Sequence, residues 1–148
     1  MQIQSLISPG RTLCGVDAGS KKRALELLAN TIAQDIPDID ADELFRSLIG
    51  RERLGSTGIG HGIAIPHCRV NCETTVGALI TLTEPIDFDA IDSQPVDILF
   101  AMLVPHDSDS EHLKTLAALA EALNKSEYRQ RLRAATSNEA LFQAALTT

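Results

Sequence analysis

The spacing of apolar residues predicts two amphipathic helices in the first third of the chain. Ser20 is a candidate N-cap, and the apolar residues after it recur three and four positions apart until Pro37 ends the pattern. Asp40 begins a second such pattern, with Glu43 three residues on as in a capping box, and Gly55 ends it. The apolar positions that we expect to be buried are Ala24, Leu25, Leu28, Ile32, Leu44, Phe45, Leu48 and Ile49.

Two apolar runs in the middle of the chain predict strands over residues 76–82 and 96–104. The second run is almost wholly apolar, so it is expected at the centre of a sheet that is covered on both faces. Residues 84–88 break the pattern and favour a turn or an edge. Because helices and strands do not alternate in a clean repeat, the pattern leaves the strand directions open.

Three more helices are expected toward the C-terminus. Ser110 or Asp109 can cap the first, and residues 126–135 form the second. The third is introduced by Thr136, with Glu139 three residues on. The residues expected on buried sides are Leu113, Leu116, Ala117, Ala120, Leu123, Leu141, Phe142 and Leu146.

Composition is typical of one cytoplasmic domain. The 148 residues are 44% hydrophobic with only four Phe, one Tyr and no Trp, so the core must consist mostly of aliphatic side chains. A net charge of -7 disfavours nucleic acid or an anionic membrane as a partner. The N-terminus lacks a charged, apolar leader, and no apolar run is long enough to insert into a membrane. Three cysteines, an odd and sparse set, are expected to be reduced thiols.

The densest signal for a functional site lies in residues 55–67, GSTGIGHGIAIPH. Four glycines allow positive φ angles and a close approach to a ligand, and Pro66 disfavours helix at the residue before it. The segment ends at His67, whose imidazole is largely neutral and nucleophilic at pH 7.

This segment resembles the active-site motif of the mannitol/fructose-type IIA proteins (EIIA type 2) of the bacterial phosphoenolpyruvate-dependent phosphotransferase system, and most closely the nitrogen-regulatory branch. The likeness continues in SKKRALE (20–26), FDAIDSQPVD (88–97) and RLRAA (131–135), and so runs through nearly the whole chain. It implies one domain over residues 1–148, an α/β fold with a mixed β-sheet flanked by helices on both sides.

The resemblance also implies a function. A protein of this kind is a phosphoryl carrier that accepts a phosphoryl group on a histidine, here His67, from a phosphorylated HPr-like protein, and regulates partners according to its phosphorylation state. His112 matches the second histidine of the family and would hydrogen-bond the phosphoryl oxygens. Arg51 matches the active-site arginine and would offset the phosphate charge. The transfer needs no metal or cofactor.

Backbone amides of the glycine loop can cradle the phosphoryl oxygens, and the expected phosphate-binding residues are Thr57, Gly58, Gly60 and Gly62. Each assignment has a structural alternative. Arg51 at a helix end also suits a solvated cation that complements the helix dipole. The basic run 21–23 is expected to be a solvated face rather than a docking patch.

Two alternative functions remain open. A sugar-specific fructose/mannitol-type IIA protein would pass its phosphoryl group to a IIB protein, although residues 88–105 favour the regulatory branch. Cys68 stands where the family usually has glycine, and this raises the possibility of a zinc site instead. The histidines and cysteines near the motif could supply zinc ligands, but their spacing matches no standard metal motif: His61, His67, Cys68, Cys72, His106 and His112.

Overall fold

The structure, a computed structural model, describes residues 3–108 and 110–148. Its strands form one six-stranded sheet in which the order along the main path is β1-β5-β6-β3-β2, and β4 pairs with β6 beyond the end of β3. The strands are β1 (Thr12–Val16), β2 (Gly58–Gly60), β3 (Ile63–Ala64), β4 (His67–Val70), β5 (Val76–Ile86) and β6 (Val96–Pro105).

The apolar strand β6 organises the sheet, as its sequence predicts. It pairs antiparallel with β5 and parallel with both β3 and β4. Its residues alternate between the faces: Leu99 and Leu103 pack into one core cluster, whereas Ile98 and Phe100 pack into another. The sheet is therefore buried on both sides, and its mixed strand directions confirm the expected fold class.

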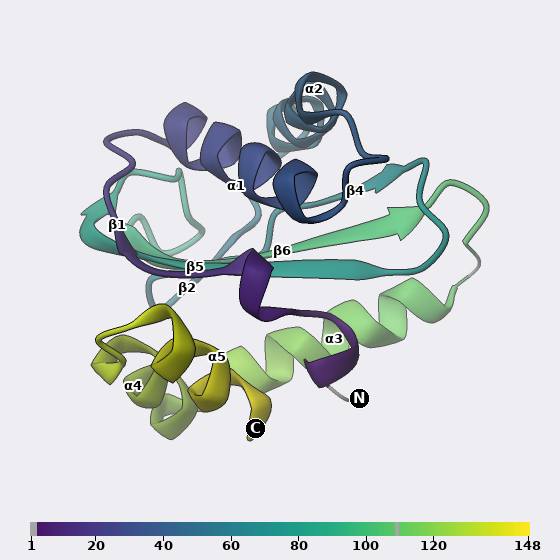
Figure 1. Cartoon of the computed structure of the whole chain (residues 1–148). Coiled ribbons are helices and arrows are strands. Elements are labelled where there is room, and N and C mark those ends of the chain that lie inside the picture. The colour runs from purple at the N-terminus through teal and green to yellow at the C-terminus, as the bar shows by residue number, and fades with distance from the viewer. Residues whose placement is uncertain (1–2, 109) are drawn as a thin grey trace.

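Five α-helices cover the two faces (Figure 1). The helices α1 (Lys21–Asp35) and α2 (Ala41–Arg53) lie on one side of the sheet. The helices α3 (Glu111–Leu123), α4 (Ser126–Ala134) and α5 (Asn138–Leu146) lie on the other, where the short 3₁₀ helix η1 (Ile3–Ser5) also packs. A second 3₁₀ helix, η2 (Pro9–Arg11), has no buried residue and is joined to α1 by the ion pair of Arg11 with Asp35. None of the helices within residues 3–108 and 110–148 is long and apolar enough to cross a membrane.

The two predicted N-caps of the first helices are confirmed. The hydroxyl of Ser20 accepts a hydrogen bond from the Arg23 amide at 3.1 Å, and the carboxylate of Asp40 accepts one from the Glu43 amide at 2.9 Å. Each cap satisfies an amide that the helix leaves without a partner, which stabilises a helix by about 1 kcal/mol.

The structure corrects some predicted details of the elements and decides between others. Strand β1 was not expected. Of the two alternatives for residues 84–88, a turn or an edge, the structure has an edge at residues 84–86, where β5 continues. Pro85 is tolerated there because β1 pairs with β5 only as far as Leu82, so no strand lies on that side of the proline. The N-cap of α5 is Ser137 rather than Thr136.

The buried side of helix α3 differs from the predicted one. Leu113 is 56% exposed and Ala117 is also exposed, whereas Leu119 and Ala122 are buried. Ser110 occupies the N-cap position without a side-chain hydrogen bond to the helix, and Asp109, the other predicted cap, lies outside the described residues. The exposed first turn of α3 lies next to the functional site.

Candidate functional site

His67 is the first residue of β4 and lies opposite Met102 of the central strand. The residues that alternate with it, Cys68 and Val70, pack into the core under α1 and α2. Because side chains alternate across a strand, His67 and Arg69 point to the face that carries α3. The imidazole is partly buried, so it combines a fixed position with access from solvent.

The backbone fixes the tautomer of His67. Its Nδ1 lies 2.7 Å from the carbonyl oxygen of Ile65. A carbonyl can only accept a hydrogen bond, so Nδ1 carries the hydrogen. In the neutral ring, Nε2 therefore keeps its lone pair, and this is the nitrogen that can act as a nucleophile.

The surroundings keep the ring neutral. Burial lowers the pKa of His67 below its ordinary value of 6.5, and this is the largest influence. The hydrogen bond to Ile65 and the charge of Glu52 raise that pKa, whereas Arg51 and His112 lower it. These electrostatic effects show that both residues predicted to assist His67, Arg51 from α2 and His112 from α3, lie within its electrostatic reach.

Arg51 belongs to the last turn of α2, and its Nη1 donates to the carbonyl oxygen of Gly55 at 2.9 Å. This bond folds the side chain back toward the loop that leads to β2. The remaining guanidinium donors are available to an anion, because no other hydrogen bond of Arg51 occurs within the described part of the chain.

Arg69 was not predicted, although the alternation after His67 places it on the same face. Its Nη1 donates to the carbonyl oxygens of Pro105, His106 and Ser108, at 3.2, 3.2 and 3.0 Å. Its Nη2 lies 3.4 Å from Nε2 of His112. Arg69 therefore fixes the loop between β6 and α3, and with it the first turn of α3 that presents His112.

Glu52 was also not predicted, although the sequence contains a signal for it. Leu44, Leu48 and Glu52 are spaced four residues apart, so a carboxylate continues the buried stripe of α2. Glu52 is 8% exposed and accepts hydrogen bonds from the Thr57 amide, at 3.1 and 3.2 Å, and from the Thr57 hydroxyl. Thr57 therefore has its amide and its hydroxyl committed to Glu52 rather than turned toward an incoming phosphate.

The predicted glycine cradle requires correction. Gly58 and Gly60 belong to β2, which forms a hairpin with β3 through a two-residue turn at His61 and Gly62. Both turn residues have positive φ, 58° and 79°, as a type I′ turn requires. The glycines therefore serve the chain geometry of a hairpin.

The hairpin turn lies at the wrong end of the sheet for a phosphate cradle. The carbonyl oxygen of Gly62 accepts from the Ile98 amide at 3.0 Å, whereas His67 is paired with Met102. Four residues of strand separate these positions, which is about 13 Å. The structure thus brings Arg51 and His112 to His67 and leaves Gly60 and Gly62 away from it. Gly58 packs against Ala90, where a Cβ atom would approach to 2.8 Å.

The histidines and cysteines of the motif region were the candidate ligands of the zinc alternative. Within residues 3–108 and 110–148, no three His, Cys, Asp or Glu side chains are grouped so that they could hold a metal ion. Burial raises the pKa of Cys68 to about 12, with a smaller contribution from Cys72, and all three cysteines are free thiols. Cys68 is thus a neutral neighbour of His67 that packs into the core, and the zinc alternative has no geometric support among these residues.

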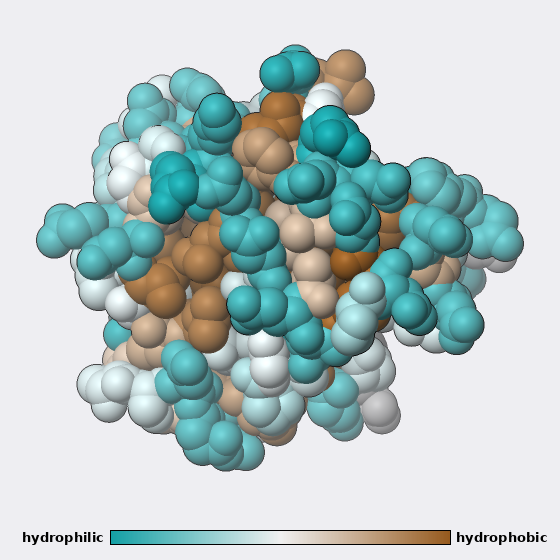
Figure 2. Space-filling view, turned by 45° about the horizontal axis from the view of Figure 1, so that its top comes forward, coloured by the Kyte–Doolittle hydropathy of each residue, from teal (hydrophilic) through white to brown (hydrophobic). Residues whose placement is uncertain are grey.

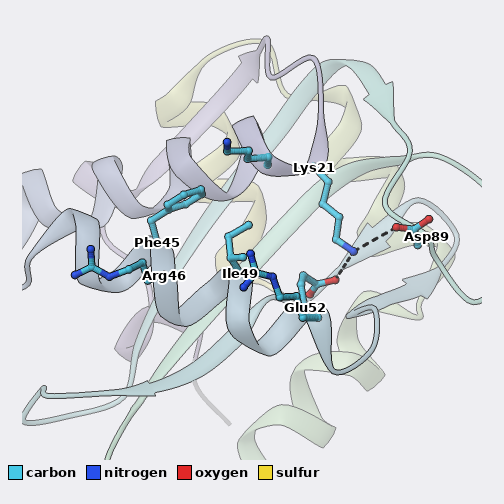
Figure 3. Close-up of a pocket in the computed structure, with 8 residues that line it drawn as sticks. Lys21, Phe45, Arg46, Ile49, Glu52 and Asp89 are labelled. Carbon is cyan, nitrogen blue, oxygen red and sulfur yellow. Dashed lines mark ion pairs between the residues drawn. The ribbon is translucent and has the colours of Figure 1, made fainter.

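On the other side of Glu52 lies an open groove between α1 and α2. Figure 2, which brings this side forward, shows apolar patches among hydrophilic side chains. In Figure 3, Lys21 reaches from α1 to the carboxylates of Glu52 and Asp89, at 2.8 and 3.6 Å. Lys21 is therefore an ion-pair partner rather than part of a solvated face. The groove encloses about 800 Å³ and is lined by Lys21, Lys22, Phe45, Arg46, Ile49, Glu52, Arg53 and Asp89.

Comparison with known proteins supports the resemblance seen in the sequence. The family model described as "Phosphoenolpyruvate-dependent sugar phosphotransferase system, EIIA 2" matches residues 5–146. A nitrogen regulatory protein of Pseudomonas aeruginosa is 47% identical over 144 residues, which cover 97% of this chain and 94% of that protein. The predicted likeness to the nitrogen-regulatory branch is thereby confirmed.

Two solved structures agree with the fold. The nitrogen regulatory protein IIA-Ntr of Neisseria meningitidis superposes with a TM-score of 0.88 at 33% identity, covering 97% of this chain and 98% of that one. The mannitol IIA of Escherichia coli superposes with a TM-score of 0.75 at 19% identity, covering 94% and 98%, and so shares the fold.

Proposed function

Because the chain belongs to the EIIA 2 family of the phosphoenolpyruvate-dependent phosphotransferase system, we propose that it is a phosphoryl carrier that accepts its phosphoryl group on His67. The donor is a phosphorylated HPr-like protein of the nitrogen-related system. The carrier acts in the cytoplasm and regulates partner proteins according to its phosphorylation state. The similarity to nitrogen regulatory proteins favours this role over that of a sugar-specific IIA protein that serves a IIB partner.

One observation carries the assignment of the acceptor atom: the hydrogen bond from Nδ1 of His67 to the Ile65 carbonyl, which leaves the lone pair on Nε2. In the transfer, this lone pair forms a new N–P bond while the N–P bond of the donor phosphohistidine breaks and its electron pair returns to the donor ring. The two bonds are of similar energy, so the step is reversible. No metal or cofactor is needed to balance it.

The neighbouring side chains supply positioning and charge. Phosphoryl transfer passes through a loose transition state, in which charge lies on the equatorial oxygens. Arg51 offers its free guanidinium donors to these oxygens, and His112 offers a ring N–H from the first turn of α3. We assign no direct phosphate contact to Thr57, Gly60 or Gly62, and Thr57 is bonded to Glu52 instead.

The test is to mix the purified chain with a phosphorylated HPr-like donor and record the intact mass. The wild type should gain one HPO₃ group through an acid-labile linkage, as expected of an N–P bond, and His67→Ala should gain none. His61→Asn is the matched control, because it removes an exposed histidine of the same motif that lies away from His67, and asparagine tolerates the positive φ of that position. Labelling of His67→Ala to the level of wild type contradicts the proposal. Rapid transfer onward to a IIB protein would instead favour the sugar-specific role.

A further inference from the structure

Glu52 occupies an unusual place for a carboxylate. Its side chain is 5% exposed, and its Oε1 pairs with Nζ of Lys21 at 2.8 Å. Both of its oxygens lie within hydrogen-bond distance of the Thr57 amide, and the Thr57 hydroxyl donates to Oε2. The carboxylate is therefore held by three groups at once, as a buried charge requires.

The contacts of Thr57 continue to the proposed acceptor. The carbonyl oxygen of Thr57 accepts a hydrogen bond from the Ile65 amide at 3.0 Å. The carbonyl oxygen of Ile65 in turn accepts from Nδ1 of His67 at 2.7 Å. Hydrogen bonds thus join Glu52 to Thr57, Thr57 to Ile65 and Ile65 to the imidazole, and the backbones of Thr57 and Ile65 connect each bond to the next.

The main chain of Glu52 also holds the loop that Arg51 contacts. The Gly55 amide donates to the main-chain oxygen of Glu52 at 3.1 Å, and the Gly55 carbonyl accepts from Arg51 at 2.9 Å. The loop between α2 and β2 is therefore fixed at Gly55 and again at Thr57. We therefore expect a change at Thr57 to affect both the peptide that orients His67 and the loop that Arg51 contacts.

We propose that Glu52 is a positioning residue for phosphoryl transfer: through Thr57 and Ile65 it holds His67 with Nδ1 bonded and Nε2 presented to the donor. The inference rests on the proposed function, and it adds a residue that contacts neither the phosphoryl group nor the donor. The negative charge of Glu52 supports the same role. It raises the pKa of His67, which the charge of Arg51 lowers, and so keeps Nε2 basic.

The first test needs no donor. Side-chain NMR of His67 reports the tautomer and the pKa of the imidazole in the wild type and in Glu52→Gln, which keeps the size of the side chain and removes its charge. We expect Glu52→Gln to lower the pKa of His67 and to populate the second tautomer. Asp89→Asn is the matched control, because it removes the other ion-pair partner of Lys21 at a side chain that is 78% exposed. It should leave both properties unchanged.

The second test measures single-turnover acceptance from the phosphorylated HPr-like donor. Glu52→Gln should slow acceptance by about tenfold to a hundredfold, the range for loss of preorganised groups at a site, while Asp89→Asn retains the wild-type rate. If Glu52→Gln does not fold, Thr57→Val gives the same readouts, since it removes one link and keeps the Lys21–Glu52 pair.

A folded Glu52→Gln or Thr57→Val protein with the wild-type tautomer, pKa and acceptance rate would overturn the proposal. These outcomes are distinct from failure of the proposed function. If the wild type itself accepts no phosphoryl group, the carrier assignment fails, whereas the NMR comparison still decides whether Glu52 positions His67.

Discussion

Arg133 forms an ion pair with Asp97 across the turn of the glycine hairpin, with 2.8 Å between Nη2 and Oδ1, and the same Nη2 donates to the carbonyl oxygen of His61 at 2.6 Å. Helix α4 is thereby joined to the start of β6 and to the hairpin. The contact lies far from His67 along the sheet. A substitution at the hairpin should therefore change the stability of the protein separately from the chemistry at His67.

This separation predicts the effect of Gly62→Ala. A Cβ atom at Gly62 would lie 2.8 Å from Oδ1 of Asp97, and the φ of 79° is unfavourable for alanine. We expect the variant to lose about 1–3 kcal/mol in free energy of unfolding, measured by urea denaturation, and to accept phosphate at the wild-type rate when folded.

Gly50→Ala is the matched control for that substitution. Gly50 lies in α2, and nothing would lie within 4 Å of a new Cβ. Alanine should stabilise the helix by about 0.5–1 kcal/mol. A strong loss of phosphoryl acceptance in folded Gly62→Ala would restore the phosphate cradle that the sequence suggested.

His112 is expected to assist the transfer without accepting the group. Replacing it with alanine should leave acceptance at His67 detectable but slow the forward and reverse rates by up to about a hundredfold, the effect of removing one transition-state donor. Rapid-quench measurements in both directions test this. Rates equal to those of the wild type would assign His112 a surface role only.

The depressed pKa of His67 predicts the pH dependence. A protonated ring has no lone pair at Nε2, so acceptance should stay constant above pH 6.5 and fall only as the pH drops through the lowered pKa. Between the lowered pKa of the folded chain and the ordinary value of 6.5, the unfolded chain binds more protons at His67 than the folded chain does. The free energy of unfolding therefore also falls as the pH falls through this range.

Two measurements check that dependence. The acceptance rate against pH should give a midpoint below 6.5, and the same midpoint should appear in the NMR titration of His67. His67→Ala should reduce the loss of unfolding free energy over this range. A midpoint above 6.5 in both measurements would contradict the assignment of burial as the dominant influence.

Cys68→Gly restores the residue that usually follows the active histidine in the family. We expect phosphorylation to be retained, because the thiol is neutral and packs into the core beneath α1 and α2. Stability should fall by about 1–2 kcal/mol, since the strand gains a glycine and the core loses a side chain. Metal analysis before and after the change completes the test. Stoichiometric zinc that disappears in Cys68→Gly, with no phosphorylation of either form, would support the metal alternative.

How much of the fold could be predicted depended on whether the signal was local. The caps at Ser20 and Asp40 and the apolar strand β6 were predictable because a few neighbouring residues determine them. Strand β1 was missed because its five residues carry little pattern and its pairing with β5 joins segments that are far apart in sequence. The buried side of α3 depends on how the helix is docked, which its own periodicity does not fix.

The candidate site shows the same limit. The motif pointed to His67 as the candidate acceptor, and family likeness pointed to Arg51 and His112, which stay predictions. Glu52 and Arg69 were missed because their contacts exist only in the folded chain. Glu52 contacts Thr57 across a loop, and Arg69 contacts Ser108 across the sheet edge. Gly60 and Gly62 were misread because glycines that bind phosphate and glycines that turn a hairpin have the same sequence signature.

The position of His67 at the start of a paired strand has a consequence for the rate of the proposed transfer. The backbone of β4 is bonded to β6, and Nδ1 is bonded to Ile65, so the imidazole cannot swing toward an incoming phosphorus. In the proposed transfer, the donor must therefore deliver the phosphorus to a stationary Nε2. We then expect the rate to depend on how often the two proteins meet in the one orientation that aligns donor nitrogen, phosphorus and Nε2, and so on the charges of the docking faces.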